Sequence, residues 1–535
     1  MKASSWQLRA TYAGEILNMR VADTGPGIRL RALSCGLILL SVALATPNAA
    51  RGESTPDWRQ VDAIFEKWNR WDTPGAALAV VREGKVIYTR GYGSAHLEYP
   101  IPITPETVFH VASVSKQFTC FAVILLAQEG KLLLDDDIHK HLSELPDFGH
   151  TITIRHLMHH TSGLRDQWQL LAIAGWRLDD VITQDHIMKL VRKQRGLNFE
   201  PGSEHLYSNT GYTLLAEIVA RVSGKSFAEF TDERIFKPLG MSSTHFHDDH
   251  ERIVPNRAYS YSHGSKGYRN SVLSFANVGA TSLFTTVEDL ARWLTNLDDA
   301  RVGGREVTRL MHERGTLTSG KTLAYASGLT YGQHRGLEIV GHDGSDAGYR
   351  SSAIRVPQHK LGVVVLSNLS TFNPGQVGKR VVEVVLADQL EPKQAQHDHA
   401  VPDIAPNEAP ERLVGDDAVS TQPPNDPPPT NSGQAAAPTE TKEKNEPDLS
   451  TYVGSYYSPE LETTYKIELR EGKLVACHQR HPDVVLRPLS TDKFIANSFY
   501  FPTAQFERGD DGHIRGMRLS GVRVRNVVFE RRSAP

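Results

Sequence analysis

The segment 391–447 most constrains the architecture of this chain, because it cannot take part in a hydrophobic core. It mixes alanine, threonine, asparagine and charged residues with proline runs at 423–424 and 427–429. Such a composition buries too little apolar surface to offset the entropy lost on ordering, so we predict a disordered, partly extended linker. The 535-residue chain is therefore predicted to fold as two domains, at 57–390 and 448–535.

Helical and strand patterns alternate through the first of these domains. Apolar residues at 76–81 and 85–88 flank a glycine turn and predict a β-hairpin, and the run Leu-Gly-Val-Val-Val-Leu at 361–366 predicts a central strand. Residues 117–128 are apolar almost all round, as in a helix that is buried inside a large domain. Helices mixed with antiparallel hairpins predict an α/β or α+β domain.

The second domain has a different pattern, in which short strands predominate. Strand-like runs at 452–457, 465–469, 473–476 and 526–529 are separated by turn signals. Short strands at regular spacing predict a small antiparallel β-barrel or sandwich.

The N-terminus has the pattern of an export signal. Two arginines, at positions 29 and 31, precede an apolar run at 33–45, and small residues follow it. These are the parts of a cleavable signal peptide, which we place at 1–50, with the start of translation open between Met1 and Met19. The apolar run is shorter than the ~20 residues that a spanning helix needs. We therefore expect a periplasmic or secreted protein without stable membrane insertion after cleavage.

Charge and cysteine content exclude several classes of function. A formal net charge of −3 does not favour nucleic acid or an anionic membrane as a partner. Cys35, Cys120 and Cys477 lie far apart and match no metal-ligand spacing. We predict neither a metal nor another cofactor.

Residues 113–116 read Ser-Val-Ser-Lys and offer a nucleophile with a base. A serine hydroxyl needs a neighbouring base at neutral pH, and positions three apart on a helix have Cβ atoms ~5–6 Å apart. The apolar helix that follows disfavours the charged form of Lys116, which makes it a usable base. The first backbone N–H groups of that helix also suit a developing oxyanion. Ser113 is the candidate nucleophile.

The same tetrad recurs at 490–493, so the pattern alone is weak evidence. That copy lies in the strand-rich region without an apolar helix behind it, and we interpret it as a surface turn. For Ser113 taken alone, the alternative is an ordinary helix cap with a solvated lysine.

Two further motifs favour catalysis over a helix cap. Tyr207 and Asn209 follow the turn at 201–202, and a phenol near a lysine can relay protons while an amide can bind a substrate carbonyl. Later, His342 and Gly344 follow an apolar run, where a glycine lets substrate approach a strand backbone closely.

These three motifs, in this order, resemble the class C β-lactamase-like serine hydrolases. That family has S-x-x-K, Y-x-N and [K/H]-x-G motifs, and it includes class C β-lactamases, D-alanyl-D-alanine carboxypeptidases, D-aminopeptidases and esterases. The stretch at 154–164 also resembles the family, and the resemblance covers about 57–390. It implies a serine β-lactamase/transpeptidase-like α/β domain. The region 448–535 resembles the small, lipocalin-like β-barrels that follow some peptidases of this family.

The resemblance also implies a role for each motif residue. Ser113 is acylated, Lys116 activates it, and Tyr207 exchanges protons with the nucleophile or the leaving group. The implied substrate-binding residues are Asn209, His342, Gly344 and Ser345, with the oxyanion between the backbone N–H groups of Ser113 and Ser345.

One departure from the family pattern concerns the third motif. β-Lactamases of this class have K-T-G there, whereas this chain has His-Asp-Gly at 342–344. Histidine is largely neutral at pH 7, so the permanent cation for a substrate carboxylate is missing, and an esterase or peptidase is favoured over antibiotic hydrolysis. We expect that lowering the pH toward 6 protonates His342 and partly restores that cation.

Four other patterns are interpreted as structural. Residues 315–322 fit a P-loop expression but lack the strand before and the helix after it, which makes an NTPase a weak alternative. The histidines around 156–160 and 245–250 lack a metalloprotease motif. The further Y-x-N at 268–270 and H-x-G at 334–336 lack family context.

The sequence therefore predicts a serine hydrolase that forms an acyl-enzyme on Ser113. Its expected substrate is a small molecule or peptide with an ester or amide bond, such as a D-amino-acid peptide or a peptidoglycan-related compound. A carboxylesterase or a weak β-lactamase is an alternative within the same chemistry. A non-catalytic penicillin- or peptidoglycan-binding protein is an alternative outside it.

Overall fold

The computed structural model describes residues 56–392 and 448–532. The predicted signal peptide, and the predicted linker apart from its first two residues, lie outside the described residues. Among the described helices, none has the length and apolar composition that a membrane span requires. Cys120 and Cys477 are free thiols.

The first domain is built on a six-stranded antiparallel sheet with the strand order β12-β13-β14-β15-β1-β2. Its strands are β1 (Ala76–Arg82), β2 (Lys85–Tyr92), β12 (Thr330–His334), β13 (Leu337–Asp346), β14 (Tyr349–Val356) and β15 (Leu361–Ser367). The predicted hairpin is confirmed as β1 and β2, and the predicted central strand is confirmed as β15, between β14 and β1.

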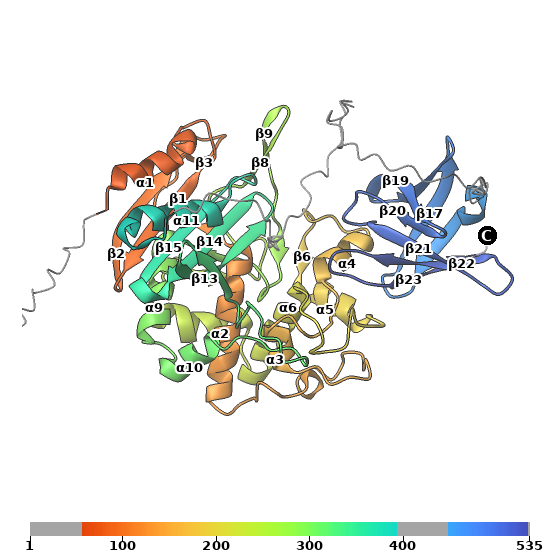
Figure 1. Ribbon diagram of the computed structural model, residues 1–535, viewed down its shortest axis with the longest axis horizontal. Helices are drawn as coiled ribbons and strands as arrows, with labels where there is room; N and C mark the ends of the chain where they lie inside the picture. The colour runs from red at the N-terminus through yellow and green to blue at the C-terminus, as the bar shows by residue number, and fades with distance from the viewer. Residues whose placement is uncertain (1–55, 393–447, 533–535) are drawn as a thin grey trace, which may run out of the picture. The chain divides into compact units, whose positions relative to one another are not determined.

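Both faces of this sheet are covered, which explains why β1 and β15 are apolar without alternation. Alternate residues of β1, such as Leu78, pack with α1 (Trp58–Phe65) and α11 (Pro374–Val385). The residues between them, such as Ala79, join the core that contains α9 (Val287–Asp299). Figure 1 shows α1 and α11 on one side of the sheet and α9 on the other.

Helix α2 (Ser115–Gln128) is the buried helix that the sequence predicts. It ends before Gly130, whose φ of +70° is a backbone conformation that favours glycine. Its start differs from the prediction, because Ser113 does not lie in the first turn of the α-helix. Ser113 lies in a short 3₁₀ turn, Ala112–Val114, that leads into α2. Ala112 has a φ of +47°, a strained value that is uncommon outside glycine.

The first domain has further helices and strands. The helices are α3 (Ile154–Met158), α4 (Gln167–Ile173), α5 (Gln184–Arg192), α6 (Asn209–Ser223), α7 (Phe227–Thr231), α8 (Lys237–Leu239) and α10 (Gly304–Met311). The strands are β3 (Ser94–His96), β4 (Ile101–Pro102), β5 (Phe109–His110), β6 (Ile182–Thr183), β7 (His245–Phe246), β8 (Tyr261–Gly264), β9 (Gly267–Asn270), β10 (Phe275–Ala276) and β11 (Leu283–Thr285).

The patterns that were interpreted as structural lie in turns and hairpins. The P-loop-like residues form a turn closed by a bridge between Thr316 and Thr322, and Val307 lies in α10 just before it. Residues 268–270 belong to β9 of a two-stranded hairpin, and 334–336 lie at the turn between β12 and β13. A helix therefore precedes the P-loop-like residues and none directly follows them, the reverse of what a phosphate-binding loop needs.

The second domain is a closed antiparallel barrel in which the strands follow one another in sequence order. They are β16 (Gly454–Ser458), β17 (Thr463–Arg470), β18 (Lys473–His478), β19 (His481–Ser490), β20 (Lys493–Ile495), β21 (Thr503–Arg508), β22 (Ile514–Ser520) and β23 (Val527–Arg532). Pairing of β16 with β23 closes the barrel, so no strand edge stays unpaired. The second S-x-x-K copy lies at the turn from β19 to β20, as predicted.

Both domains belong to one compact unit of the chain, and buried polar contacts join them. Arg165 Nη1 donates to both carboxylate oxygens of Glu460 at 2.6 and 2.8 Å, and the side chains are 5% and 3% exposed. Arg165 Nη2 also donates to the carbonyl of Asn526, which lies just before β23. The barrel is therefore docked on the first domain by a buried ion pair.

Candidate active site

Ser113 and Lys116 meet in the interior of the first domain, as their spacing predicts. Ser113 is 4% exposed and Lys116 is fully buried. Nζ of Lys116 lies 3.0 Å from Oγ of Ser113, within hydrogen-bond reach. The second serine-lysine pair, at 490–493, has no buried helix behind it and lies at a turn of the barrel.

The other contacts of Lys116 determine which way its protons point. Nζ donates to Oδ1 of Asn209 at 2.8 Å and to the carbonyl of Ala280 at 2.7 Å. Both oxygens can only accept hydrogen bonds, so they take both N–H groups of a neutral amine. The lone pair of that amine is then directed toward the hydroxyl of Ser113. The geometry is that of a general base set to accept the serine proton.

The surroundings of Lys116 favour its neutral form. Burial lowers the pKa of Lys116 to about 7, against the charges of Asp346 and Asp166, which raise it. The guanidinium of Arg523 lowers this pKa further. A large share of Lys116 is therefore neutral at physiological pH, which a general base requires.

Asp166 holds Asn209 in place, and sequence analysis did not find it. Its Oδ2 accepts from both the backbone N–H and Nδ2 of Asn209, each at 2.8 Å. Because Nδ2 must face this carboxylate, Oδ1 of Asn209 must face Lys116. The bond to the backbone N–H also explains why α6 begins at Asn209, earlier than Tyr212, where the helical pattern begins. Asn209 is thus placed between Lys116 and Asp166, and its predicted contact with substrate stays a prediction.

Tyr207 lies beside the lysine, with its ring centroid 4.9 Å from Nζ of Lys116. Its hydroxyl is buried. Burial raises the pKa of Tyr207, and the nearby Ser113 hydroxyl and the charge of Arg523 oppose that rise. Tyr207 therefore lies close to both Ser113 and Lys116, and its predicted proton transfer stays a prediction.

Gly344 brings strand β13 against the backbone of the nucleophile. A Cβ atom at this position would lie 2.4 Å from the carbonyl oxygen of Val111 and 3.0 Å from the backbone nitrogen of Ser113. The glycine thus admits the backbone of the turn that carries Ser113, and its predicted contact with substrate stays a prediction. Ser345 follows it on the same strand, so its predicted pairing with Ser113 in an oxyanion hole is compatible with the strand's position.

His342 lies in a buried hydrogen-bonded chain behind Tyr207. Its Nδ1 faces the carbonyl of Asp343 at 2.6 Å and therefore carries the proton, which leaves Nε2 to accept from the Tyr325 hydroxyl at 3.4 Å. Tyr325 also lies 3.1 Å from Nε2 of His160, whose Nδ1 accepts from the backbone N–H of Ser208. This series of hydrogen bonds links His342 of the third motif to Ser208, the residue after Tyr207.

The burial of His342 corrects one expectation. The imidazole is 1% exposed, and burial, helped by the charge of Lys116, lowers its pKa to about 3. Protonation near pH 6 is therefore not expected, since the ring has neither solvent nor a carboxylate to stabilise the charge. Its predicted role in substrate binding stays a prediction, now for a neutral ring.

Asp346 supplies a second carboxylate at the end of β13. The hydroxyl of Thr281 donates to it, and Nε2 of His110 lies 3.9 Å from it. Burial raises the pKa of Asp346, and the charge of Lys116 opposes that effect. His110 also accepts the backbone N–H of Ala112 at 3.2 Å, which supports the strained residue before Ser113.

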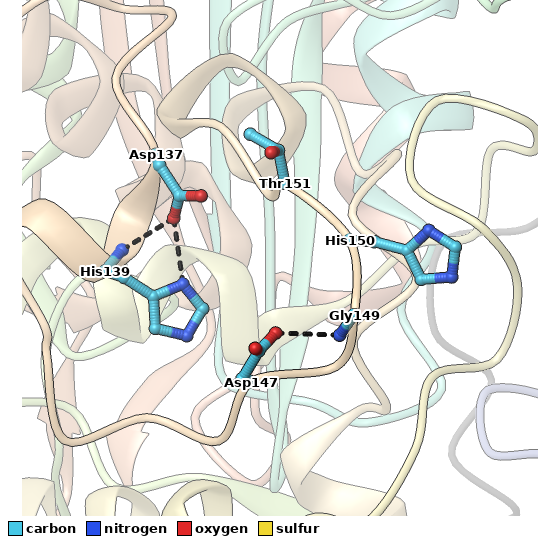
Figure 2. Close-up of a pocket in the computed structure, with 6 residues that line it drawn as sticks. All are labelled: Asp137, His139, Asp147, Gly149, His150 and Thr151. Atoms are coloured by element: carbon cyan, nitrogen blue, oxygen red, sulfur yellow. Dashed lines mark hydrogen bonds and ion pairs between the residues drawn. The ribbon is translucent and has the colours of Figure 1, made fainter.

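No group of three or more metal-ligating side chains gathers in the described part of the chain. His156 caps the start of α3, whereas His160 lies after the end of that helix and has a φ of +58°. A hollow elsewhere on the surface does not include Ser113, and Figure 2 shows that several of its polar groups bond one another. It is lined by Asp137, His139, Asp147, Gly149, His150 and Thr151.

Four site residues were missed by sequence analysis, namely Asp166, Tyr325, Asp346 and Arg523. Asp166 precedes the apolar run of α4, where the sequence suggests only a helix N-cap. In the structure it does cap α4, and it also binds Asn209. Asp346 and Tyr325 follow no motif, and Arg523 belongs to the other domain. Only the tertiary structure brings them to the site.

Comparison with known proteins finds a family match and curated relatives. The family model described as Beta-lactamase matches residues 61–387. A D-aminopeptidase of Gluconobacter oxydans is 30% identical over 303 residues, which is 56% of each chain. A D-aminopeptidase of Brucella anthropi is 28% identical over 295 residues, 55% of this chain and 56% of the relative. The chain thus spans about half the length of the curated relatives it matches.

Solved structures extend the similarity in fold. The octameric penicillin-binding protein homologue from Pyrococcus abyssi has a TM-score of 0.56 and 23% identity, covering 89% of this chain and 100% of its own. The D-amino acid amidase from Ochrobactrum anthropi SV3 has a TM-score of 0.54 and 23% identity, covering 62% of this chain and 99% of its own. Because the family model matches more than half of its residues, the chain belongs to the beta-lactamase family of serine hydrolases.

Proposed function

We propose that this protein hydrolyses an amide bond that follows a D-amino-acid residue, through an acyl-enzyme on Ser113. The observation that carries the proposal is the set of contacts around Lys116. Two acceptor oxygens occupy both N–H groups of a neutral Lys116, and its lone pair is left for the Ser113 hydroxyl. This arrangement favours transfer of the serine proton to Lys116.

Acylation follows from these positions. Oγ of Ser113 bonds to the substrate carbonyl carbon while its proton passes to Nζ of Lys116, and the carbonyl electron pair becomes an oxyanion. Backbone N–H groups of Ser113 and Ser345 stabilise that oxyanion. The C–N bond then breaks as Tyr207 delivers a proton to the leaving nitrogen, and Lys116 returns a proton to Tyr207.

Deacylation uses the same base. Lys116 is neutral again, so it accepts a proton from a water molecule whose oxygen attacks the acyl carbon. The bond from that carbon to Oγ breaks, and Oγ takes the proton back from Lys116. The products are a free carboxylic acid and the amine released earlier, and the protein is unchanged.

The D-amino-acid preference is supported by the curated relatives. Those reported above are D-aminopeptidases that share 30% and 28% identity with this chain over 303 and 295 residues. Because the matched region is about half of each relative, their activity is carried here only as a proposal. The neutral, buried His342 also fits an amide substrate better than a β-lactam that needs a cation at the third motif.

The test is hydrolysis of D- and L-aminoacyl p-nitroanilides by the full chain. We expect a higher kcat/KM for the D form, and loss of that activity in Ser113→Ala. Ser490→Ala is the matched control, since it removes the serine of the other S-x-x-K copy from a turn of the barrel. Equal rates for both enantiomers, or full activity in Ser113→Ala, would contradict the proposal.

A covalent probe separates the alternatives. Stable labelling of Ser113 by a penicillin without turnover of any ester or amide would favour a non-catalytic penicillin-binding protein. Faster hydrolysis of simple esters than of D-aminoacyl amides would favour a carboxylesterase. In either case Ser113→Ala should lose the label.

A further inference from the structure

The loop between β22 and β23 of the barrel docks beside the active site through its main chain. The backbone N–H of Arg523 donates to Oε1 of Gln169 at 2.9 Å. Its carbonyl accepts from Nδ2 of Asn198 at 2.9 Å and from the backbone N–H of Asp166 at 3.2 Å. Since Asp166 also holds Asn209, the barrel loop is tied directly to the residue that orients Lys116.

The side chain of Arg523 faces the catalytic tyrosine. Its guanidinium carbon lies 4.9 Å from the ring centroid of Tyr207, the same distance as Nζ of Lys116 from that centroid. The charge of Arg523 acts on both Tyr207 and Lys116. Burial has the largest effect on their pKa values, and the positive charge of Arg523 lowers the pKa of each.

Neither His342 nor Lys116 provides a permanent cation beside Tyr207. His342 is neutral, and Lys116 is partly neutral because burial lowers its pKa. A guanidinium keeps its charge at any physiological pH and can bind a carboxylate through two N–H groups.

We propose that Arg523 is a specificity-determining residue that binds a carboxylate of the substrate beside Tyr207. The barrel, which follows the linker, thereby supplies a cation in Arg523. The third motif lacks one, because it has His342 in place of a lysine. This inference rests on the proposed function, and it names the substrate class as a D-aminoacyl peptide with a free carboxylate near the scissile amide. It reverses the preference for uncharged substrates that the neutral His342 predicts from sequence alone.

The first experiment compares a D-alanyl dipeptide with its C-terminal amide as substrates of the full chain. We expect wild type to favour the free carboxylate in kcat/KM and Arg523→Gln to lose about 10- to 100-fold of that preference, the scale of a hydrogen bond to a charged group. Arg523→Lys keeps the charge and should retain part of the preference. The main-chain bonds of the loop do not involve the side chain, so the variants should stay folded.

Arg525→Gln is the matched control, because it removes the same charge from the same loop. Arg525 pairs with Glu204 at 2.9 Å and its guanidinium lies near Phe199, not near Tyr207. An equal loss of preference in this variant would mean that loop docking or net charge is responsible, and it would overturn the role of Arg523.

A binding experiment separates this inference from the proposed function. In a Ser113→Ala background, calorimetric titration with the dipeptide and with its amide measures recognition without turnover. If wild type cleaves neither compound, the proposed function fails, while tighter binding of the carboxylate form that disappears in Arg523→Gln still supports the inference. Equal affinities for both forms, with or without Arg523, overturn the inference whatever the hydrolysis shows.

Discussion

At the scale of single residues, the charge state of Lys116 decides whether this site can act. The spacing in the sequence predicts that Ser113 and Lys116 are neighbours, and the structure places their side chains 3.0 Å apart. Spacing does not predict which protons the lysine carries. That follows from Asn209, which Asp166 orients so that its oxygen faces Nζ. Asp166 therefore orients the hydrogen bonds of Lys116 indirectly, through Asn209.

Replacing Lys116 tests this assignment. Arginine cannot act as a base, so Lys116→Arg should cost about as much as Lys116→Ala, each about 10²–10⁴-fold in kcat/KM. Lys493→Arg, in the other S-x-x-K copy, should leave the rate unchanged. Most of the activity surviving in Lys116→Arg would show that Lys116 acts through its charge alone.

At the scale of elements, the site depends on how closely strand β13 approaches the 3₁₀ turn of Ser113. A glycine at position 344 allows the two backbones to touch, and His110 supports the turn through Ala112. Strand β14 contributes as well, because the Ser351 hydroxyl donates to the carbonyl of Val111 at 2.8 Å. The nucleophile is thus held by two strands of the sheet as well as by α2.

Gly344→Ala tests this contact. The added Cβ would lie 2.4 Å from the Val111 carbonyl oxygen, so β13 or the turn must move, and a shift of about 1 Å can cost about 10²-fold in rate. Gly332→Ala on strand β12 is the matched control, because a Cβ there meets nothing within 4 Å. The measurement is the rate of Ser113 labelling by a fluorophosphonate. Equal labelling of both variants would rule out the close approach.

At the scale of the whole molecule, polar contacts join the barrel to the first domain. Arg165 and Glu460 form a buried ion pair between them, and the loop that carries Arg523 bonds the main chain beside Asp166. A buried charge that loses its partner is costly, because the interior cannot solvate it. The docking of the barrel should therefore contribute to the stability of the whole chain.

Glu460→Gln removes one charge of this pair with little change of shape. It leaves the Arg165 guanidinium buried without a counter-ion, and we expect the free energy of unfolding to fall by about 3–5 kcal/mol. Asp483→Asn is the control, because its pair with Arg470 is exposed at 46% and 49%. The measurement is the urea concentration at the midpoint of unfolding of each variant. Equal midpoints for the two variants would contradict a stabilising interface.

Buried neutral histidines should also make the protein sensitive to acid. Burial lowers the pKa of His342 to about 3 and that of His159 to about 4, from an ordinary value of 6.5. Between those values the unfolded chain binds protons that the folded chain does not, so stability is lost as the pH falls below about 6.5. Each such histidine contributes a slope of about 1.4 kcal/mol per pH unit.

The check is urea denaturation at several pH values between 7.5 and 4.5. His342→Gln should reduce the slope of unfolding free energy against pH, whereas His150→Gln, at a side chain that is 46% exposed, should not. A stability that does not change over this range would show that the histidines are solvated or paired.

The sequence by itself determined the architecture and the local catalytic pair. Apolar runs predict the hairpin, the central strand and the buried helix, because period and composition are local properties of the chain. The spacing of Ser113 and Lys116 predicts their contact for the same reason. The match of the beta-lactamase family model, at residues 61–387, spans all three motifs.

Only the tertiary structure decided the charges of the site. The burial of His342 depends on Tyr325 and its neighbours, which no local pattern reveals. Asp166 reaches Asn209 across 43 positions of sequence, and Arg523 reaches Tyr207 from the other domain. Electrostatic effects depend on distance and solvent exposure in three dimensions, and positions that are far apart along a chain carry no local signal of either.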